Sequence, residues 1–426
     1  MASDPPILIT NARLLTIASG SENRSPRRGD AMSDLGIVDR GWILVRDGVI
    51  EDLGPGTPDP PPGAQIVHAD GRVVMPAFVD CHTHACFVGD RSAEFQAQIA
   101  GATYLEILAS GGGIMSTVRS VRAASETELT ESLLVGLERT LRLGTGSIEV
   151  KSGYGLDPET ELKMLRAIAA AADRTPQIVC PTYLGAHALD ADAADQKISV
   201  ERIIDEGLPE AAASFPGIAC DAYCEQGAWS LEECRRLFEV AVALGCPIRV
   251  HTDQFHRLGM TRLAVDMGAR SVDHLEASDA EDLQAIAASE TIAVLLPVSG
   301  FCLDDRYASG RELIDLGAAV AVASNYNPGS ALSPSMPFAI ALACRKNRLQ
   351  PAEAIVAATW NAACVLGLQD EVGSLEPGKR ADLVMLDSPH EHGLTFEFAG
   401  PGPAAVMVAG AWRDLSWNGS GQNPPA

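Results

Sequence analysis

Residues 74–84 read VMPAFVDCHTH, an apolar run that ends in two histidines separated by one residue. Alternate side chains of a strand point to the same face, so His82 and His84 are expected to lie side by side. Seven further runs of this kind follow at 147–152, 178–187, 219–225, 247–253, 271–277, 292–299 and 319–327. Eight short strands with helical patterns in most of the gaps predict an α/β fold, a (β/α)8 TIM barrel.

The gaps between these strands carry helical signals. Residues 159–172 (ETELKMLRAIAAAA) and 230–244 (SLEECRRLFEVAVAL) repeat apolar side chains with a period near 3.6 residues. Two more helical stretches, 335–347 and 351–367, follow the last strand. We therefore expect residues 76–369 to form a hydrolase-type barrel domain.

Both ends of the chain have β character. Three short apolar or alternating runs precede residue 76, two more follow residue 380, and Gly, Asp and Pro divide them. We expect residues 1–75 and 370–426 to form one small β-sandwich domain beside the barrel. The polar segment 19–34 is predicted to be a loop, and residues 418–426 are predicted to be disordered.

The composition excludes some classes of partner. Lys plus Arg is 32 and Asp plus Glu is 56, a net charge of −24, which argues against nucleic-acid and membrane partners. No signal peptide and no long apolar span are recognised, so we expect a cytoplasmic protein whose ten cysteines are free thiols. Cys220 and Cys224 would pack in the core. An anionic substrate would need a well-placed arginine in its pocket.

Histidines gather where barrel enzymes hold their sites, at the C-terminal ends of strands. Five of the nine histidines fall there: His82, His84, His187, His251 and His274. One such histidine is ordinarily a core or surface residue, but three neutral histidines with open coordination positions are typical of a catalytic zinc or iron. Such a metal lowers the pKa of bound water from about 15.7 toward about 7, and the hydroxide attacks amide-like carbonyl carbons. A carboxylate nearby usually takes the proton.

Several motifs carry a family resemblance. VMPAFVDCHTHACFVGDR resembles the HxH signature of the amidohydrolase superfamily, and residues 7–412 are similar to the imidazolonepropionase family. KSGYGL, LGAHA and NPGS are specific to that family, whereas HxH and EPGKRADLV mark the superfamily; GATYLEI and VDHLE add to the match. The resemblance implies hydrolysis of the ring amide of 4-imidazolone-5-propanoate to N-formimidoyl-L-glutamate, a step of histidine degradation, by a homodimer.

The resemblance also implies a set of site residues. One divalent metal, zinc or iron, would be bound by His82, His84, His251 and Asn325, while His274 and Gln254, with Asn325, would do the catalytic work. The substrate would be held by Arg91, Tyr154, His187, Asn327, Gly329 and Ser330. A guanidinium fork suits a propanoate carboxylate. The plainer alternatives are a surface ion pair for Arg91 and packing at the barrel rim for Tyr154.

Two further polar residues of the strands have competing interpretations. Lys151 could suggest the carbamylated lysine that bridges two metals in some superfamily members, but the resembling family uses one metal and the residue lies on the second strand. A bridging role is therefore not expected. Asp80 points away from the HxH pair, so we expect it to be a structural hydrogen-bonding group.

The eighth strand departs from the family pattern. The family has an aspartate before [FY]NPGS that is both a metal ligand and the proton acceptor, whereas this chain reads VASNYNPGS, with Asn325 at that position. An amide oxygen is a weaker ligand and cannot accept the proton, and loss of a general base costs about 10²–10⁴ in rate. Gln254 similarly stands where a glutamate is often found.

Three explanations for Asn325 remain open at this point. It is a deliberate Asp→Asn replacement, or a natural change with His274 or His187 sharing the proton work, or the mark of a relative that binds a small anion without turnover. A different amidohydrolase activity, such as a deaminase or a hydantoin-type hydrolase, is a separate alternative because the same scaffold and metal would serve it.

Overall fold

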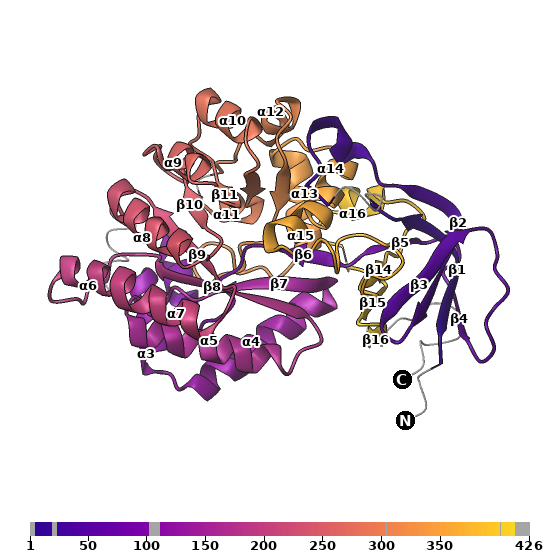
Figure 1. The fold of residues 1–426 in the computed structure, drawn as a ribbon, viewed down its shortest axis with the longest axis horizontal. Helices are drawn as coiled ribbons and strands as arrows, with labels where there is room; N and C mark the ends of the chain where they lie inside the picture. The colour runs from indigo at the N-terminus through magenta and orange to yellow at the C-terminus, as the bar shows by residue number, and fades with distance from the viewer. Residues whose placement is uncertain (1–4, 19–23, 102–110, 304, 401, 414–426) are drawn as a thin grey trace.

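Eight parallel strands form the centre of the computed structural model, which describes residues 5–18, 24–101, 111–303, 305–400 and 402–413 (Figure 1). Their order follows the chain, from β6 to β13. The strands are β6 (Phe78–Asp80), β7 (Thr145–Lys151), β8 (Ile178–Ala186), β9 (Ala219–Cys224), β10 (Arg249–Thr252), β11 (Ser271–His274), β12 (Ile292–Leu295) and β13 (Val320–Val322). The predicted TIM barrel is confirmed.

The first and last strands of the barrel meet just beyond their C-terminal ends. Thr83 and Tyr326 form an isolated parallel bridge. The backbone N–H of Asn325 donates to the carbonyl of His82 at 3.1 Å, and that of His84 donates to Tyr326 at 2.9 Å. The chain therefore nearly closes the barrel at the point where the HxH motif and the NPGS motif adjoin.

Helices surround the barrel and fill the gaps where the sequence predicted them (Figure 1). Ser125 and Ser230 begin α4 and α8 with capping boxes, and Asp157 caps α5. The helices are α1 (Ser92–Ile99), α3 (Ile114–Ala123), α4 (Glu126–Arg142), α5 (Pro158–Ala172), α6 (Gln196–Arg202), the π-helix η2 (Ile203–Gly207), α7 (Leu208–Ser214), α8 (Leu231–Ala243), α9 (Met260–Asp266), α10 (Ala280–Ala287), α11 (Pro297–Cys302), α12 (Gly310–Asp315), α13 (Met336–Lys346), α14 (Pro351–Ala357), α15 (Trp360–Leu366) and α16 (His392–Phe396). Most of the GATYLEI motif lies outside the described residues.

Both chain ends contribute to one mixed sheet beside the barrel, as the sequence predicted (Figure 1). Its path is β16-β15-β14-β5-β1-β2-β3, with β4 paired to β1. The strands are β1 (Ile7–Leu15), β2 (Ile37–Arg46), β3 (Val49–Pro55), β4 (Gln65–His68), β5 (Val73–Pro76), β14 (Leu383–Met385), β15 (Ala405–Val408) and β16 (Ala411–Arg413). Antiparallel pairing of β5 with β14 joins the two ends, and the sheet has its own apolar core.

The segment predicted as a loop, residues 19–34, contains a short 3₁₀ helix, η1 (Gly29–Ser33). Met32 is fully buried, and the backbone N–H of Gly29 donates to Ala318 of the barrel. Burial of one apolar side chain thus orders part of a polar segment, which the sequence prediction missed. Residues 19–23 and the tail expected to be disordered, 418–426, lie outside the described residues.

The cysteines lie as the sequence predicted. All ten are free, and Cys220 and Cys224 are buried in the barrel core. Among the described residues, no helix has both the length and the apolar character needed to cross a membrane.

Candidate active site

Four histidines converge at the C-terminal ends of the barrel strands. His82 follows β6, His251 lies in β10 and His274 ends β11, and one ring nitrogen of each lies within 4.8 Å of the others. The Nε2 atoms of His84 and His251 are 3.2 Å apart. All four side chains are buried. The strand-end histidines that the sequence singled out are therefore brought together in space.

Buried carboxylates fix the orientation of two of these rings. His82 Nδ1 lies 2.5 Å from Asp273 Oδ2, and His251 Nδ1 lies 3.0 Å from Asp221 Oδ1. An ionised carboxylate only accepts hydrogen bonds, so Nδ1 carries the proton in both rings and the lone pair of Nε2 faces the cluster. This is the orientation that a metal-binding imidazole needs.

A buried ion network holds the two carboxylates in turn. Lys151 Nζ lies 2.7 Å from Glu149 Oε2 and 2.7 Å from Asp221 Oδ2, while Arg249 pairs with Glu149 and, at 2.9 Å, with Asp273. Burial alone would raise the pKa of Asp221, but the hydrogen bond from His251 and the charge of Lys151 hold it well below its ordinary value. Lys151 is thus a structural cation whose charge two carboxylates balance.

Sequence reasoning missed most of this network. Glu149 and Lys151 are two residues apart on β7, and Asp273 directly precedes His274, so strand periodicity was the available signal. Charged residues inside short apolar strands need buried partners. The sequence could therefore have indicated that these charged strand residues form a buried network. It could not have indicated which residue pairs with which.

The residues present fit a divalent metal. His82 Nε2, His84 Nδ1 and Asn325 Oδ1 are buried and have no hydrogen-bond partner among the described residues. Burial lowers the pKa of His82, His84 and His251, so these rings are neutral near neutral pH and offer lone pairs. Unsatisfied buried acceptors are costly, and a cation bound by His82 Nε2 and Asn325 Oδ1 would remove that cost for these two atoms.

The backbone at the cluster adopts left-handed conformations that side chains rarely take. The φ angle is 86° at His274 and 56° at Asn325. Asparagine and histidine adopt this region more often than most residues, but it remains a sparsely populated conformation that costs free energy. Such strain is typical of functional sites, where the surrounding structure imposes it.

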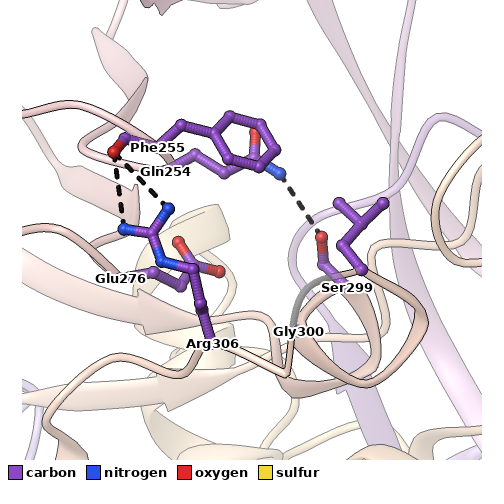
Figure 2. Close-up of a pocket in the computed structure, with 7 residues that line it drawn as sticks. Gln254, Phe255, Glu276, Ser299, Gly300 and Arg306 are labelled. Atoms are coloured by element: carbon purple, nitrogen blue, oxygen red, sulfur yellow. Dashed lines mark hydrogen bonds between the residues drawn. The ribbon is translucent and has the colours of Figure 1, made fainter. Parts of the chain in front are cut away.

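A small pocket beside the cluster is shown in Figure 2. Gln254 Oε1 accepts a hydrogen bond from the Tyr223 hydroxyl at 2.9 Å, and Gln254 Nε2 lies 3.5 Å from Ser299 Oγ. His274 Nδ1 lies 3.2 Å from Glu276 Oε1. The pocket is lined by Gln254, Phe255, Glu276, Ser299, Gly300, Leu303 and Arg306. Of these, only Gln254 was named from the sequence.

Arg91 lies directly against the NPGS loop. A Cβ added at Gly329 would come within 2.6 Å of Arg91 Nη1, so the guanidinium lies in close contact with this glycine and would have to shift for a larger residue. Arg91 also pairs with Glu94 at 2.8 Å. The ion pair considered as the plainer alternative therefore exists, and it sits at the position the resemblance gives to substrate binding.

The side chain of Asn327 forms hydrogen bonds with the backbone of its own loop. Its Oδ1 accepts from the backbone N–H of Gly329 at 2.8 Å and of Ser330 at 2.7 Å. Its Nδ2 donates to the carbonyl of Asn325 at 2.6 Å. Asn327, Gly329 and Ser330, the predicted substrate-binding residues of this loop, are thus held together by hydrogen bonds among themselves.

Tyr154 and His187 pack beside the HxH pair. The rings of His84 and His187 are stacked with centroids 4.7 Å apart, and Tyr154 lies 5.3 Å from His187. His187 Nδ1 is 2.8 Å from the carbonyl of Gly153. Burial lowers the pKa of His187 to about 3 and raises that of Tyr154, so both groups are neutral at ordinary pH.

Asp80 accepts hydrogen bonds from the backbone N–H and the hydroxyl of Ser324. It is thus the structural hydrogen-bonding group that the sequence predicted.

The model of the amidohydrolase family matches residues 73–413. The chain belongs to the amidohydrolase family. It is 45% identical over 411 residues to an imidazolonepropionase of Symbiobacterium thermophilum, covering 94% of this chain and 95% of the relative. It is 43% identical to an imidazolonepropionase of Rubrobacter xylanophilus, covering 93% and 96%.

Solved structures share the fold at low sequence identity. A triazine hydrolase variant superposes with a TM-score of 0.76 at 17% identity, covering 96% of this chain and 94% of the other. An adenosine deaminase of Xanthomonas campestris, crystallised with bound zinc, has a TM-score of 0.70 at 18% identity, covering 96% and 93%. These likenesses establish the barrel and its companion sheet.

Proposed function

We propose that this amidohydrolase opens the ring amide of 4-imidazolone-5-propanoate to give N-formimidoyl-L-glutamate in histidine degradation. The relatives at 43–45% identity are imidazolonepropionases along nearly their whole length. The observation that carries the proposal is Arg91, whose guanidinium lies against Gly329 at the same barrel end as the histidine cluster. A carboxylate-bearing ring needs both features within one pocket.

The metal in this proposal is a single divalent ion, zinc or iron. His82, His84 and His251 would hold it together with the amide oxygen of Asn325, which is buried and unpartnered among the described residues. When bound, it supplies a Lewis acid that lowers the pKa of water. The carboxylates behind His82 and His251 keep the rings in the tautomer that binds it.

The chain's own residues would divide the remaining work. Hydrolysis must remove a proton from water and deliver one to the ring nitrogen that leaves. Asn325 cannot carry a proton, so in this proposal His274 would move it at Nε2, while its Nδ1 is engaged by Glu276. Gln254, fixed by Tyr223, would orient the ring by hydrogen bonds. Arg91, Tyr154, His187 and the loop of Asn327, Gly329 and Ser330 would hold the substrate.

The proposal also includes the cellular compartment, the oligomeric state and the partners of the enzyme. We place it in the cytoplasm as a homodimer that acts on a small anionic heterocycle and binds neither nucleic acid nor membrane. The net charge of −24 supports the exclusion of polyanionic partners. The free cysteines fit a reducing compartment.

A second candidate is hydrolysis or deamination of another small heterocycle. The observation that favours it is the shared fold of the adenosine deaminase and the triazine hydrolase variant. A third is a relative that binds a small anion without turnover, which Asn325 would explain. Arg91 separates the first two, because a ring without a carboxylate leaves this guanidinium without a ligand.

The test compares the protein with its Asn325→Asp variant on freshly generated 4-imidazolone-5-propanoate, with bound metal quantified in both. We expect the variant to be at least about a hundredfold faster, because the carboxylate restores the proton acceptor. A ring analogue without the propanoate tail should be a poor substrate for both. If neither form yields product when fully loaded with metal, the proposal is wrong, and the alternatives remain.

A further inference from the structure

A second cavity, of about 380 Å³, lies at the opposite end of the barrel from the histidines. Its lining includes Val179 near the start of β8, Ala219 and Arg249 at the starts of β9 and β10, and Arg270, which directly precedes β11. Because the barrel strands are parallel, these residues share the N-terminal face. This floor cavity is therefore separate from the candidate active site.

The floor cavity contains a guanidinium without a counter-ion. Arg270 makes no ion pair and no side-chain hydrogen bond with any residue the structure describes. The other guanidinium that lines the cavity, that of Arg249, already forms ion pairs with Glu149 and Asp273. An unpaired cation that is partly withdrawn from water costs free energy, so proteins ordinarily pair it.

The groups around Arg270 also leave its positive charge without compensation. Burial, followed by repulsion from Arg249, lowers the pKa of Arg270. The ionisable groups that oppose this shift are the thiols of Cys180 and Cys364. Burial raises the pKa of each thiol to about 12, so both are neutral at ordinary pH. No carboxylate of the described chain neutralises Arg270.

The backbone leaves room for this guanidinium. Gly367 ends α15 with φ at 74°, and a Cβ there would lie 3.1 Å from Arg270 Nη1. The backbone of Arg270 is fixed by hydrogen bonds to Ile248 and Ile292. The remaining walls are largely apolar, among them Val179, Ile218 and Leu366. The site thus combines one fixed cation with an apolar chamber, and its volume falls in the range of small-molecule pockets.

We propose that the floor cavity binds a small monocarboxylate with an apolar body, and that Arg270 holds the carboxylate. Because the cavity contains a single unpaired guanidinium, we expect a ligand with a single negative group. The apolar walls favour a hydrocarbon or aromatic remainder over a second charged group. This site goes beyond the proposed ring hydrolysis and does not depend on it.

The test is calorimetric titration of the metal-loaded protein with benzoate, using benzamide as the uncharged isostere and sulfate as the bare anion. We expect one benzoate site per chain, with benzamide and sulfate each binding more weakly. Arg270→Met should weaken benzoate at least about tenfold, because a charge-assisted hydrogen bond is lost. Arg262→Met is the matched control, since Arg262 is exposed and pairs with Asp266 on α9.

Benzoate could also reach the catalytic end, so Arg91→Met is titrated in parallel. Loss of binding in Arg91→Met with full binding in Arg270→Met would overturn the proposal, and so would sulfate that binds as tightly as benzoate. Absence of benzoate binding to the unaltered protein would do the same. The denaturation midpoint of Arg270→Met should equal or exceed that of the parent, because an unpaired charge has been removed, which separates lost binding from lost folding.

Discussion

His82 Nδ1 lies 2.5 Å from Asp273 Oδ2, and both side chains are fully buried. The contact joins the segment just after β6 to β11, and Asp273 in turn accepts hydrogen bonds from Arg249 and Ser271. The imidazole is thereby held with Nε2 toward the other histidines. Metal affinity should depend on this carboxylate although it never touches the metal.

Asp273→Asn should lower metal affinity about 10–100-fold, the cost typical of an outer-shell partner of a histidine ligand. The amide can still accept one hydrogen bond but no longer fixes the tautomer or raises the basicity of the ring. The measurement is competition with a chelator of known affinity. Asp266→Asn, at an exposed position on α9, is the control and should match the parent. Equal affinities for all three proteins would show that Asp273 has only a packing role.

Lys151→Met should destabilise the metal-free protein by about 3–5 kcal/mol, because it leaves Glu149 and Asp221 buried without their shared cation. Urea unfolding of metal-free samples measures this. Lys197→Met, at an exposed position on α6, should stay within about 0.5 kcal/mol of the parent. A loss as small as that of the control would mean that Arg249 alone balances the network.

The sequence predicted the barrel because each strand is a short apolar run and the helices between strands have clear periodicity. It also predicted the convergence of His82, His84, His251 and His274, because parallel strands end at one face. It could not predict the pairing of Lys151 with Asp221, since register and side-chain reach decide that contact. Nor could it predict η1, whose order comes from the burial of one methionine in a polar segment.

Arg91→Lys should raise KM for the proposed substrate about tenfold or more and leave kcat nearly unchanged. Lysine keeps the charge but loses the two-pronged geometry that matches a carboxylate. Steady-state kinetics of the Asn325→Asp background measures both constants. Glu94→Gln is the companion variant, because Glu94 fixes the guanidinium at 2.8 Å. It should raise KM less than Arg91→Lys does. A fall in kcat alone would place Arg91 away from the carboxylate.

The pH dependence of stability should reveal the lowered pKa of His187, a half-buried side chain. Burial lowers the pKa of His187 to about 3 in the folded protein, whereas an exposed histidine in the unfolded chain titrates near 6.5. The unfolded chain therefore binds the extra proton first as the pH falls. The contribution of His187 to stability is present above about pH 6.5 and is lost progressively as the pH falls toward about 3.

Each pH unit within that window corresponds to about 1.4 kcal/mol at most for a single group. His187→Asn keeps a donor for the Gly153 carbonyl and removes the titration. Urea unfolding of metal-free protein and variant at about pH 7.5 and about pH 5 should show the parent losing up to about 2 kcal/mol more than the variant. Parallel losses would mean that His187 takes up its proton in the folded state as easily as in the unfolded chain, and that its stacking on His84 leaves the ring open to water.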